Sequence, residues 1–508
     1  MTTFAHRSRP GRILWRAAAI GLAVLSGATL WNPRVAWAAT ITVTTTIDEN
    51  NTDGDCSLRE AVRAANRNAA VDACPAGSAS GIDTINVPAG DYLFLLDGDG
   101  EQAALTGDLD LTDDVAIVGA GRAATVIHAN GLENVFSVDS AGADSVLISN
   151  LTLTGGAAVG AALYIGHGSV TLDNVRVTNH VGSNSVIYMI GDSLTINNSR
   201  IDGNAGALFV NVPEAVTTIR NTVFSDNATD TNGGAISNNG TLRLINVTLS
   251  GNSSAGNGGA LKLTGPTELY NVTIANNLAD SDADESGDGG GVWIDPAASV
   301  VAANTLIANN GDGSLTTDHA DCSGTLNSLG TNLIESMTGC IVAGFSNNIL
   351  GLDPVIGALA NNGGQTFTHA LLAGSPALNA GDNGGCREIN GVLVGVDQRG
   401  YARVDRCDIG AFEANSPGTP TPSATPTMTA TPTVTRTPTP SSTPTPTPTA
   451  TQTLPATATA TATTSQVPPQ KLWLPEIHQD QSLLPGGAVP RPDRDRRGVG
   501  TAELRLTR

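Results

Sequence analysis

The chain is poor in aromatic residues, which make up 4% of its 508 positions. Sugar-binding grooves usually present aromatic rings as stacking platforms, so this composition argues against an extensive sugar groove. Lysine is scarce too, since Lys262 is the only one between residues 39 and 470. The seven histidines show no metal-binding spacing, and neither C-x-x-C nor G-x-S-x-G occurs. The sequence therefore gives no support for a zinc or dithiol motif, or for a serine nucleophile elbow.

Long apolar runs are also missing, apart from one stretch at residues 17–30. That stretch is too short to span a membrane comfortably. It follows a segment with four arginines and precedes Ala36-Trp37-Ala38, an A-x-A cleavage pattern. We predict that residues 1–38 are a secretory signal peptide, so that the mature protein is extracellular or attached to the cell envelope. An uncleaved anchor is the alternative, which is disfavoured because no charged stop-transfer flank follows.

Basic residues are few in the body of the chain. Residues 39–415 hold 42 Asp and Glu against 13 Lys and Arg, a net charge of −29. Such a body repels phosphate groups, so nucleic acid and anionic membrane surfaces are not expected partners. Binding of calcium or of a cationic partner remains an alternative. The simpler explanation of the negative charge is the solubility of a secreted monomer.

The chain has six cysteines, which form three pairs of neighbours in the sequence: Cys56/Cys74, Cys322/Cys340 and Cys386/Cys407. An even number of cysteines behind a signal peptide is typical of disulfides formed in an oxidising compartment. Six cysteines allow 15 connectivities, so pairing of sequence neighbours is a preference and not a deduction.

A short phrase, apolar-x-Asn-x-Thr-apolar in its commonest form, returns about every 24 residues. The copies begin at residues 148, 172, 196, 219, 244, 269 and 302. A fixed period of this length indicates stacked copies of one supersecondary unit. Each period has room for three short strands and three turns and shows no helical pattern. We therefore predict an all-β, single-stranded parallel β-helix of about ten coils over residues 82–350, with asparagines stacked as ladders.

Both ends of such a solenoid need a cover, because an open end exposes apolar side chains and unpaired strand edges. Residues 57–68 predict the one short helix, which begins with an S-x-x-E capping box at Ser57 and Glu60. We expect residues 39–81 to form the N-terminal cap and residues 351–415 to cap the far end. Residues 416–470 are a Thr/Pro-rich stalk, and residues 471–508 are a tail that is a candidate sorting or anchor segment.

Several segments resemble known surface-protein families. Residues 56–61 read C-S-L-R-E-A, which resembles the CSLREA segment of secreted bacterial β-helix proteins. Residues 362–366 (NGGQT), 374–378 (GSPAL), 397–400 (DQRG) and 407–413 (CDIGAFE) are similar to the cap called choice-of-anchor Q. Residues 224–236 are similar to the repeats of polymorphic outer-membrane proteins. This resemblance implies a right-handed, pectin-lyase-like β-helix displayed at the cell surface, and it supplies no catalytic residues.

Two acidic loops are candidates for binding calcium. In residues 49–60, Asn51, Asp53, Gly54 and Glu60 occupy positions 3, 5, 6 and 12 of an EF-hand loop, but position 1 is Glu49. Since Glu60 is already explained as a capping residue, the structural interpretation is favoured there.

The second acidic loop lies where the repeat lengthens from about 24 to 33 residues. Insertions in solenoids map to loops and often to the binding face. The candidate residues, predicted to bind calcium or a glycan, are Asp280, Asp282, Asp284, Glu285, Asp288 and Trp293. A solvated loop with the indole packed beneath it is the simpler alternative.

We expect a non-enzymatic surface protein that binds an extracellular glycan or mediates adhesion. A polysaccharide lyase or hydrolase is the first alternative, since parallel β-helices often carry such enzymes and Lys262 is a candidate base. The fold alone does not decide between them. A structural surface spacer is the second alternative.

Overall fold

The computed structural model describes residues 38–414, except for 99, 182–184, 315–317, 346, 389 and 405. The predicted signal peptide, stalk and tail lie outside the described residues, apart from residue 38. Among the described residues, no helix is long and apolar enough to cross a membrane.

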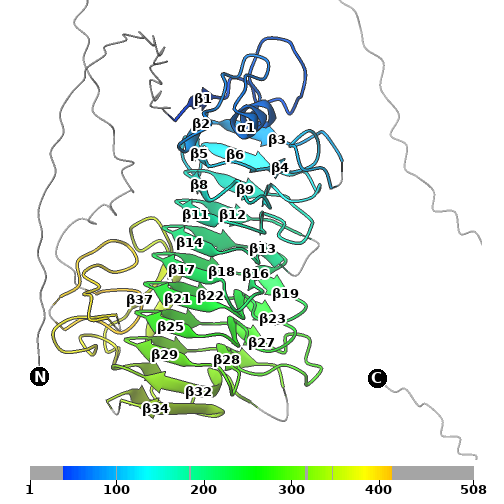
Figure 1. Cartoon of the computed structure of the whole chain (residues 1–508). Coiled ribbons are helices and arrows are strands. Elements are labelled where there is room, and N and C mark those ends of the chain that lie inside the picture. The colour runs from blue at the N-terminus through cyan, green and yellow to red at the C-terminus, as the bar shows by residue number, and fades with distance from the viewer. Residues whose placement is uncertain are drawn as a thin grey trace, which may run out of the picture. The chain divides into compact units, whose positions relative to one another are not determined.

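The chain folds as a parallel β-helix whose strands stack in ladders, one strand per coil (Figure 1). Ladder 1 pairs twelve strands among the described residues, close to the expected count of about ten coils. They are β1 (Thr40–Thr42), β2 (Asp83–Val87), β5 (Val115–Gly119), β8 (Ser145–Ser149), β11 (Ser169–Asp173), β14 (Ser193–Asn197), β17 (Val216–Arg220), β21 (Thr241–Ile245), β25 (Thr267–Tyr270), β29 (Val300–Ala303), β32 (Cys322–Ser328) and β34 (Cys340–Gly344).

Ladder 2 precedes ladder 1 in each coil and joins it through β32. Its other strands are β4 (Leu109–Asp110), β7 (Phe136–Val138), β10 (Leu163–Ile165), β13 (Ser185–Met189), β16 (Ala207–Val210), β20 (Ile236–Asn238), β24 (Leu261–Leu263) and β28 (Val292–Ile294).

Ladder 3 follows ladder 1 in each coil and forms an 11-stranded sheet. Its strands are β3 (Gly90–Leu93), β6 (Thr125–His128), β9 (Thr152–Thr154), β12 (Arg176–Thr178), β15 (Arg200–Asp202), β18 (Val223–Ser225), β22 (Thr248–Ser250), β26 (Thr273–Ala275), β30 (Leu306–Ala308), β33 (Leu333–Ile334) and β35 (Ile349–Leu350). A short ladder 4 comprises β19 (Ala228–Thr229), β23 (Ser253–Ser254), β27 (Leu278–Ala279) and β31 (Gly311–Asp312).

The repeated phrase spans the corner between ladders 1 and 3. Its first apolar residue is the last but one of a ladder 1 strand. In successive coils these residues stack in one buried row: Ile148, Leu172, Ile196, Ile219, Leu244 and Leu269. The central asparagine turns the chain with a positive φ, 58° at Asn150 and 54° at Asn246. Asparagine adopts this left-handed conformation more readily than most residues, so the phrase is a strand–corner–strand unit.

Asparagines do stack along the axis, and a second, more deeply buried set was not predicted. At the first corner, Asn174 Nδ2 donates to Asn150 Oδ1 over 2.7 Å, and Asn221 and Asn246 likewise donate to the asparagine of the preceding coil. Asn198 interrupts this row, because its Nδ2 donates to Asp173. The second set follows ladder 3 and is continuous, with each side chain donating to the next: Asn204, Asn227, Asn252, Asn277, Asn310 and finally Asp321. It satisfies polar groups inside the solenoid that would otherwise be buried without partners.

The N-terminal cap confirms the predicted helix. Helix α1 spans Leu58–Arg67, with Ser57 as N-cap and both bonds of the capping box to Glu60 present. It lies over the first coils at the end of the solenoid (Figure 1). The side chain of Arg59 in this helix is fully buried, and its Nε forms an ion pair with Asp48 at 2.7 Å.

All three predicted disulfides join sequence neighbours. Cys56–Cys74 closes the N-terminal cap, and Cys322–Cys340 joins the last coils. Cys386–Cys407 lies in the C-terminal segment.

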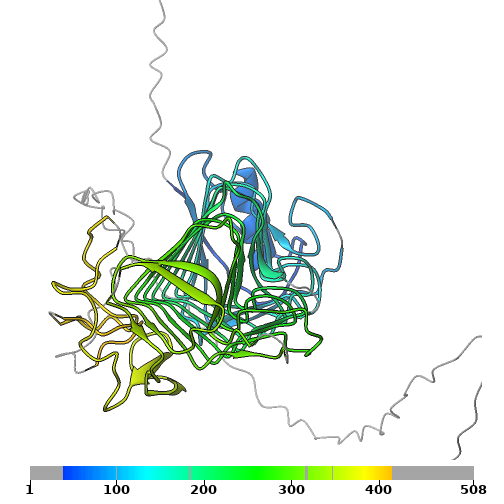
Figure 2. The same cartoon turned by 90° about the horizontal axis from the view of Figure 1, so that it is seen from below.

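The C-terminal segment, residues 351–414, differs from our expectation that it caps the far end. It folds back along the side of the solenoid, as two views at right angles agree (Figures 1 and 2), and carries the antiparallel pair β36 (Ile356–Ala360) and β37 (Thr368–Leu371). Glu388 pairs with Arg220 and Arg243 in two successive ladder 1 strands, at 3.0 and 2.6 Å. On ladder 3, His369 bonds Ser250 at 2.9 Å. These contacts cover ladders 1 and 3 and leave the outward face of ladder 2 open.

The far end of the solenoid consequently ends in strand β34, which pairs on one side only among the described strands. Apolar side chains there are exposed, including Ile341 at 62% and Leu352 at 52%. The argument that an apolar end needs a cover therefore placed the C-terminal segment wrongly. The segment is held on the side of the solenoid by these polar contacts and by two apolar clusters. One cluster packs Cys386, Val394 and Cys407 on ladder 1, and the other packs Leu371, Ala377 and Ile409 on ladder 3.

Candidate functional site

The middle side chains of the ladder 2 strands point away from the core, because side chains alternate across a strand. In β10, β13, β16, β24 and β28 the two flanking positions are buried and the middle position is partly exposed. The middle serines of β7 and β20, Ser137 and Ser237, are buried at 7% and 5% exposure. Strand pairing aligns these middle residues in one row: Ser137, Tyr164, Tyr188, Phe209, Ser237, Lys262, Trp293 and Ser323. We call these residues the outward row.

Three aromatic rings of the outward row lie against one another, one pair stacked and one pair tilted. The ring centroids of Tyr164 and Tyr188 are 5.7 Å apart with planes 12° apart, and those of Tyr188 and Phe209 are 5.6 Å apart with planes 47° apart. Asn211 Nδ2 donates a 2.6 Å hydrogen bond to the Tyr188 hydroxyl. Since each ring also packs on its neighbour, the surface is held in place before any ligand binds.

A groove of about 570 Å³ runs over this part of the row. Tyr188, Phe209, Ser237 and Lys262 contribute to its floor, while Asn232 lies in a turn at its side. No carboxylate is among the described residues that line the groove. The groove thus combines aromatic rings, hydroxyl and amide groups and a single ammonium group.

The comparisons with known proteins add a fold and no family. No protein-family model matches the sequence, and no curated protein matches it.

Solved structures with a similar fold include two enzymes of Azotobacter vinelandii. The A-module of mannuronan C-5 epimerase AlgE4 is 18% identical, with a TM-score of 0.34, over 53% of this chain and 73% of that chain. The A-module of AlgE6 is 20% identical, with a TM-score of 0.33, over 53% and 81%. Pectate lyase Pel9A is 16% identical, with a TM-score of 0.43, over 74% and 98%. The likeness concerns the parallel β-helix fold alone and gives no information on activity.

The predicted acidic insertion is the loop between β27 and β28. The carboxylate oxygens of Asp280, Asp282 and Asp284 come within 4.8 Å of one another. Asp280 is 1% exposed and organises the loop, because it accepts from the backbone amides of Asp284 and Glu285 and from Ser314 Oγ. Asp282 and Asp284 point into solvent at the surface. Calcium binding by this loop stays a prediction.

Of the other three predicted site residues, Glu285 is exposed in the same loop, whereas Asp288 and Trp293 belong to the outward row or contact it. Trp293 is itself a member of the row. Asp288 accepts a 2.8 Å hydrogen bond from Ser323 Oγ, the next member, and pairs with His319 Nδ1 at 2.6 Å. The insertion therefore contributes one carboxylate to the end of the row, where it is already held by two partners.

The outward row itself was not predicted from the sequence. Lys262 and Trp293 were recognised as unusual residues, and Lys262 does lie on the outside, but neither was connected with Tyr164, Tyr188 or Phe209. A signal exists in hindsight: each of these residues is flanked by two apolar residues in the strand that precedes the phrase. Aligning the coils at that strand would have brought the five residues into one column.

Proposed function

We propose that this protein is a surface β-helix that binds an extended, uncharged polysaccharide along the outward row without cleaving it. The proposal rests on one observation, the adjoining aromatic rings of Tyr164, Tyr188 and Phe209 in a row that continues to Lys262 and Trp293. Aromatic faces bind the apolar faces of sugar rings, and a row with one residue per coil matches a ligand that repeats along its length.

Charge favours an uncharged ligand. The described body belongs to a region with a net charge of −29, and Lys262 is the one cation of the outward row. A polyanionic polysaccharide would meet repulsion over most of its length. Hydroxyl and amide groups at the groove, including Ser237, Asn232 and Asn239, are suited to hydrogen bonds with neutral sugars.

Hydrolysis of a glycosidic bond normally requires two carboxyl groups on either side of the bond. The groove has none among its described lining residues, and Asp288 lies two coils beyond Ser237 and is paired with His319. This absence favours binding over hydrolysis. Lys262 could serve as the base of an elimination reaction, as in a polysaccharide lyase. The experiment must therefore distinguish a lyase from a protein that binds the polysaccharide without cleaving it.

The decisive experiment is a binding and turnover panel with neutral and acidic polysaccharides. We expect retention on a neutral glycan without release of reducing or unsaturated ends. Tyr188→Ala and Trp293→Ala should weaken retention about tenfold or more, corresponding to about 1–3 kcal/mol per stacking contact. Phe345→Ala, which removes an exposed aromatic ring at the far end of the solenoid, is the matched control.

Two outcomes would overturn the proposal. Release of unsaturated ends that is lost in Lys262→Gln would identify a lyase. Absence of both binding and turnover across the panel would favour the structural spacer. Location at the cell envelope is part of the proposal and is tested separately, by fractionating cells that express the full chain.

A further inference from the structure

The outward row is not uniform along the solenoid, because its aromatic rings gather at two places. Tyr164, Tyr188 and Phe209 form the first, and the exposed Val159 lies beside them at the groove. Trp293 forms the second, where its indole is partly exposed. We call the first place the ring platform and the second the indole platform. Each offers apolar surface to the C–H faces of sugar rings.

A polar section two coils long separates the platforms. Its row residues are Ser237, which is 5% exposed, and Lys262. Asn232 and Asn239 line the same part of the groove. Their side-chain oxygens accept hydrogen bonds from the next coil, Asn232 from a backbone amide at 2.9 Å and Asn239 from a threonine hydroxyl. These bonds orient both side chains and leave their NH₂ groups as donors to sugar hydroxyls.

The pairing register sets the distance between the platforms. Phe209 and Trp293 are three strand spacings apart, and Tyr164 and Trp293 are five. Since neighbouring strands lie about 4.8 Å apart, the first separation is about 14 Å and the second is about 24 Å. A short ligand therefore contacts one platform, whereas a ligand that contacts both must extend along the solenoid axis.

The groove favours a ligand that lies along this axis. Its lining residues include members of four successive ladder 2 strands, β13, β16, β20 and β24, so its long direction follows the stack of coils. Asn232 precedes β20 and Asn239 follows it, so polar side chains border the groove on both sides. A chain that crossed the row at right angles would contact one or two coils, and hence a single platform.

We propose that the outward row selects its glycan by length, so that only a chain that contacts both platforms binds tightly. This inference rests on the proposed function, because it concerns the same row. One unit of an extended, β-1,4-linked glycan is about as long as one strand spacing, so about four units reach from Phe209 to Trp293 and about six cover the row from Tyr164 onward. The ligand class is an extended neutral glycan of at least that length, and chains of two or three units contact one platform.

The indole platform contributes more than its own contact area suggests. Once a chain lies on the ring platform, contact with Trp293 is intramolecular and costs little further freedom of motion. Stacking on one aromatic side chain changes affinity by about tenfold or more. We therefore expect a step in affinity at the length that reaches Trp293, instead of an equal gain for each added unit.

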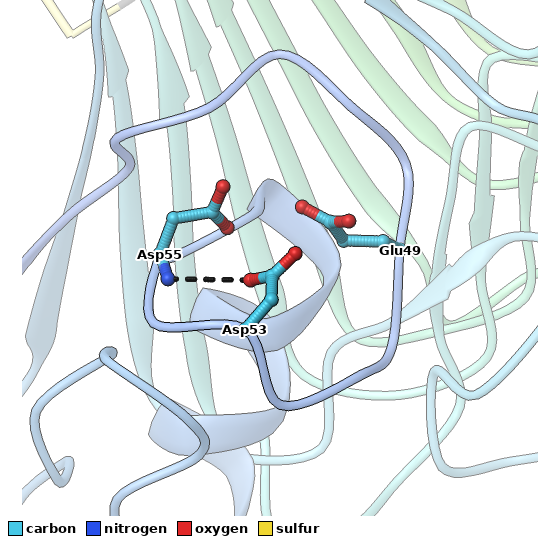
Figure 3. Close-up of side chains that lie close together, drawn as sticks. All are labelled: Glu49, Asp53 and Asp55. Carbon is cyan, nitrogen blue, oxygen red and sulfur yellow. Dashed lines mark hydrogen bonds between the residues drawn. The ribbon is translucent and has the colours of Figure 1, made fainter.

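Metal ions are not expected to take part in this selection. Among the described residues, three groups of carboxylates could hold a metal ion, and none includes a member of the outward row. One of them, Glu49 with Asp53 and Asp55, lies in the loop before α1 of the N-terminal cap (Figure 3). The step in affinity should therefore be the same in the presence of calcium and of a chelator.

The test is isothermal titration calorimetry of the full chain with β-1,4-linked glucose, mannose and xylose oligosaccharides of two, three, four, six and eight units. We expect the dissociation constant to fall about tenfold or more between three and six units and to change little beyond that length. Trp293→Ala should remove this fall and leave the binding of two and three units unchanged. Tyr188→Ala should weaken binding at every length, because the ring platform is the larger of the two.

Two control variants separate this selection from general effects. Phe345→Ala removes an exposed ring at the far end of the solenoid and should leave every dissociation constant unchanged. Trp293→Phe keeps a ring and should retain the step. A longer chain also binds in more registers, which raises affinity gradually with length, but that gain does not depend on Trp293. Circular dichroism verifies that each variant is folded.

Three outcomes would overturn selection by two platforms and leave the proposed function intact. They are binding without a step in length, a step that survives in folded Trp293→Ala, and a step that is lost with the chelator. Absence of binding by all three series at every length would overturn the proposed function and this inference together.

Discussion

The buried asparagine ladder makes a quantitative prediction about Asn252. Its Oδ1 accepts from the backbone amide of Asn227 at 3.2 Å and from Asn227 Nδ2 at 2.9 Å. Its Nδ2 donates to the Phe224 carbonyl at 3.1 Å and to Asn277 Oδ1 at 2.9 Å. Asn252→Ala removes all four hydrogen bonds at a site that is 1% exposed.

The cost follows from the groups left behind. The Asn227 amide loses its acceptor at the corner, and an unsatisfied buried donor costs about 1–3 kcal/mol. The remaining lost bonds add about 1 kcal/mol each where no other partner replaces them. We expect the free energy of unfolding to fall by about 3 kcal/mol or more. Equilibrium denaturation in guanidinium chloride, followed by circular dichroism, measures it.

Two variants sharpen the result. Asn347→Ala, at an exposed site near the last coil, should change stability by about 0.5 kcal/mol or less. Asn252→Asp keeps an acceptor for Asn227 but places a second acceptor against the Asn277 oxygen and the Phe224 carbonyl. It should be strongly destabilised at neutral pH and recover as the pH falls and the carboxyl takes up a proton. A cost below about 1 kcal/mol for Asn252→Ala would refute the claim that the ladder stabilises the solenoid.

Three further predictions concern titration and docking. Burial lowers the pKa of His180 to about 4, so between about pH 6.5 and 4 the unfolded chain binds one proton more than the folded chain. The free energy of unfolding should therefore fall by up to about 3 kcal/mol as the pH drops through that window. In His180→Gln, the urea midpoint of unfolding should no longer show this fall with pH. Burial raises the pKa of Asp321 to about 6, so between about pH 4 and 6 the folded chain holds a proton that the unfolded chain has lost. The contribution of Asp321 to stability should therefore fall as the pH rises through that window, and Asp321→Asn should remove this fall. Glu388→Ala leaves two arginines on the solenoid without their shared carboxylate and should increase the rate of limited proteolysis in the C-terminal segment. The control Glu214→Ala, at an exposed turn, should leave that rate unchanged. Equal proteolysis rates in the two variants would contradict this role for Glu388.

Much of the fold could be predicted because the coil is a local unit. The phrase around Asn150 and its copies encodes a strand end, a left-handed corner and a strand start within six residues, and the period then specifies stacking. The capping box at Ser57 is also local, and so is the proximity of each cysteine to its partner. These features depend on residues that lie close together in the sequence, so the sequence by itself determined the β-helix and its N-terminal helix. It only favoured the disulfide pairing, which the structure then decided.

The tertiary structure decided which residues from different coils meet. Tyr188, Phe209 and Trp293 come from coils of unequal length, so only the pairing register places them in one outward row. The C-terminal segment lies beside the solenoid through long-range contacts that no periodicity encodes: Glu388 meets arginines 145 and 168 residues away, and apolar side chains of the segment pack on ladders 1 and 3. Contacts of this kind depend on packing and register over long separations, and for that reason they decide the candidate sites of this protein.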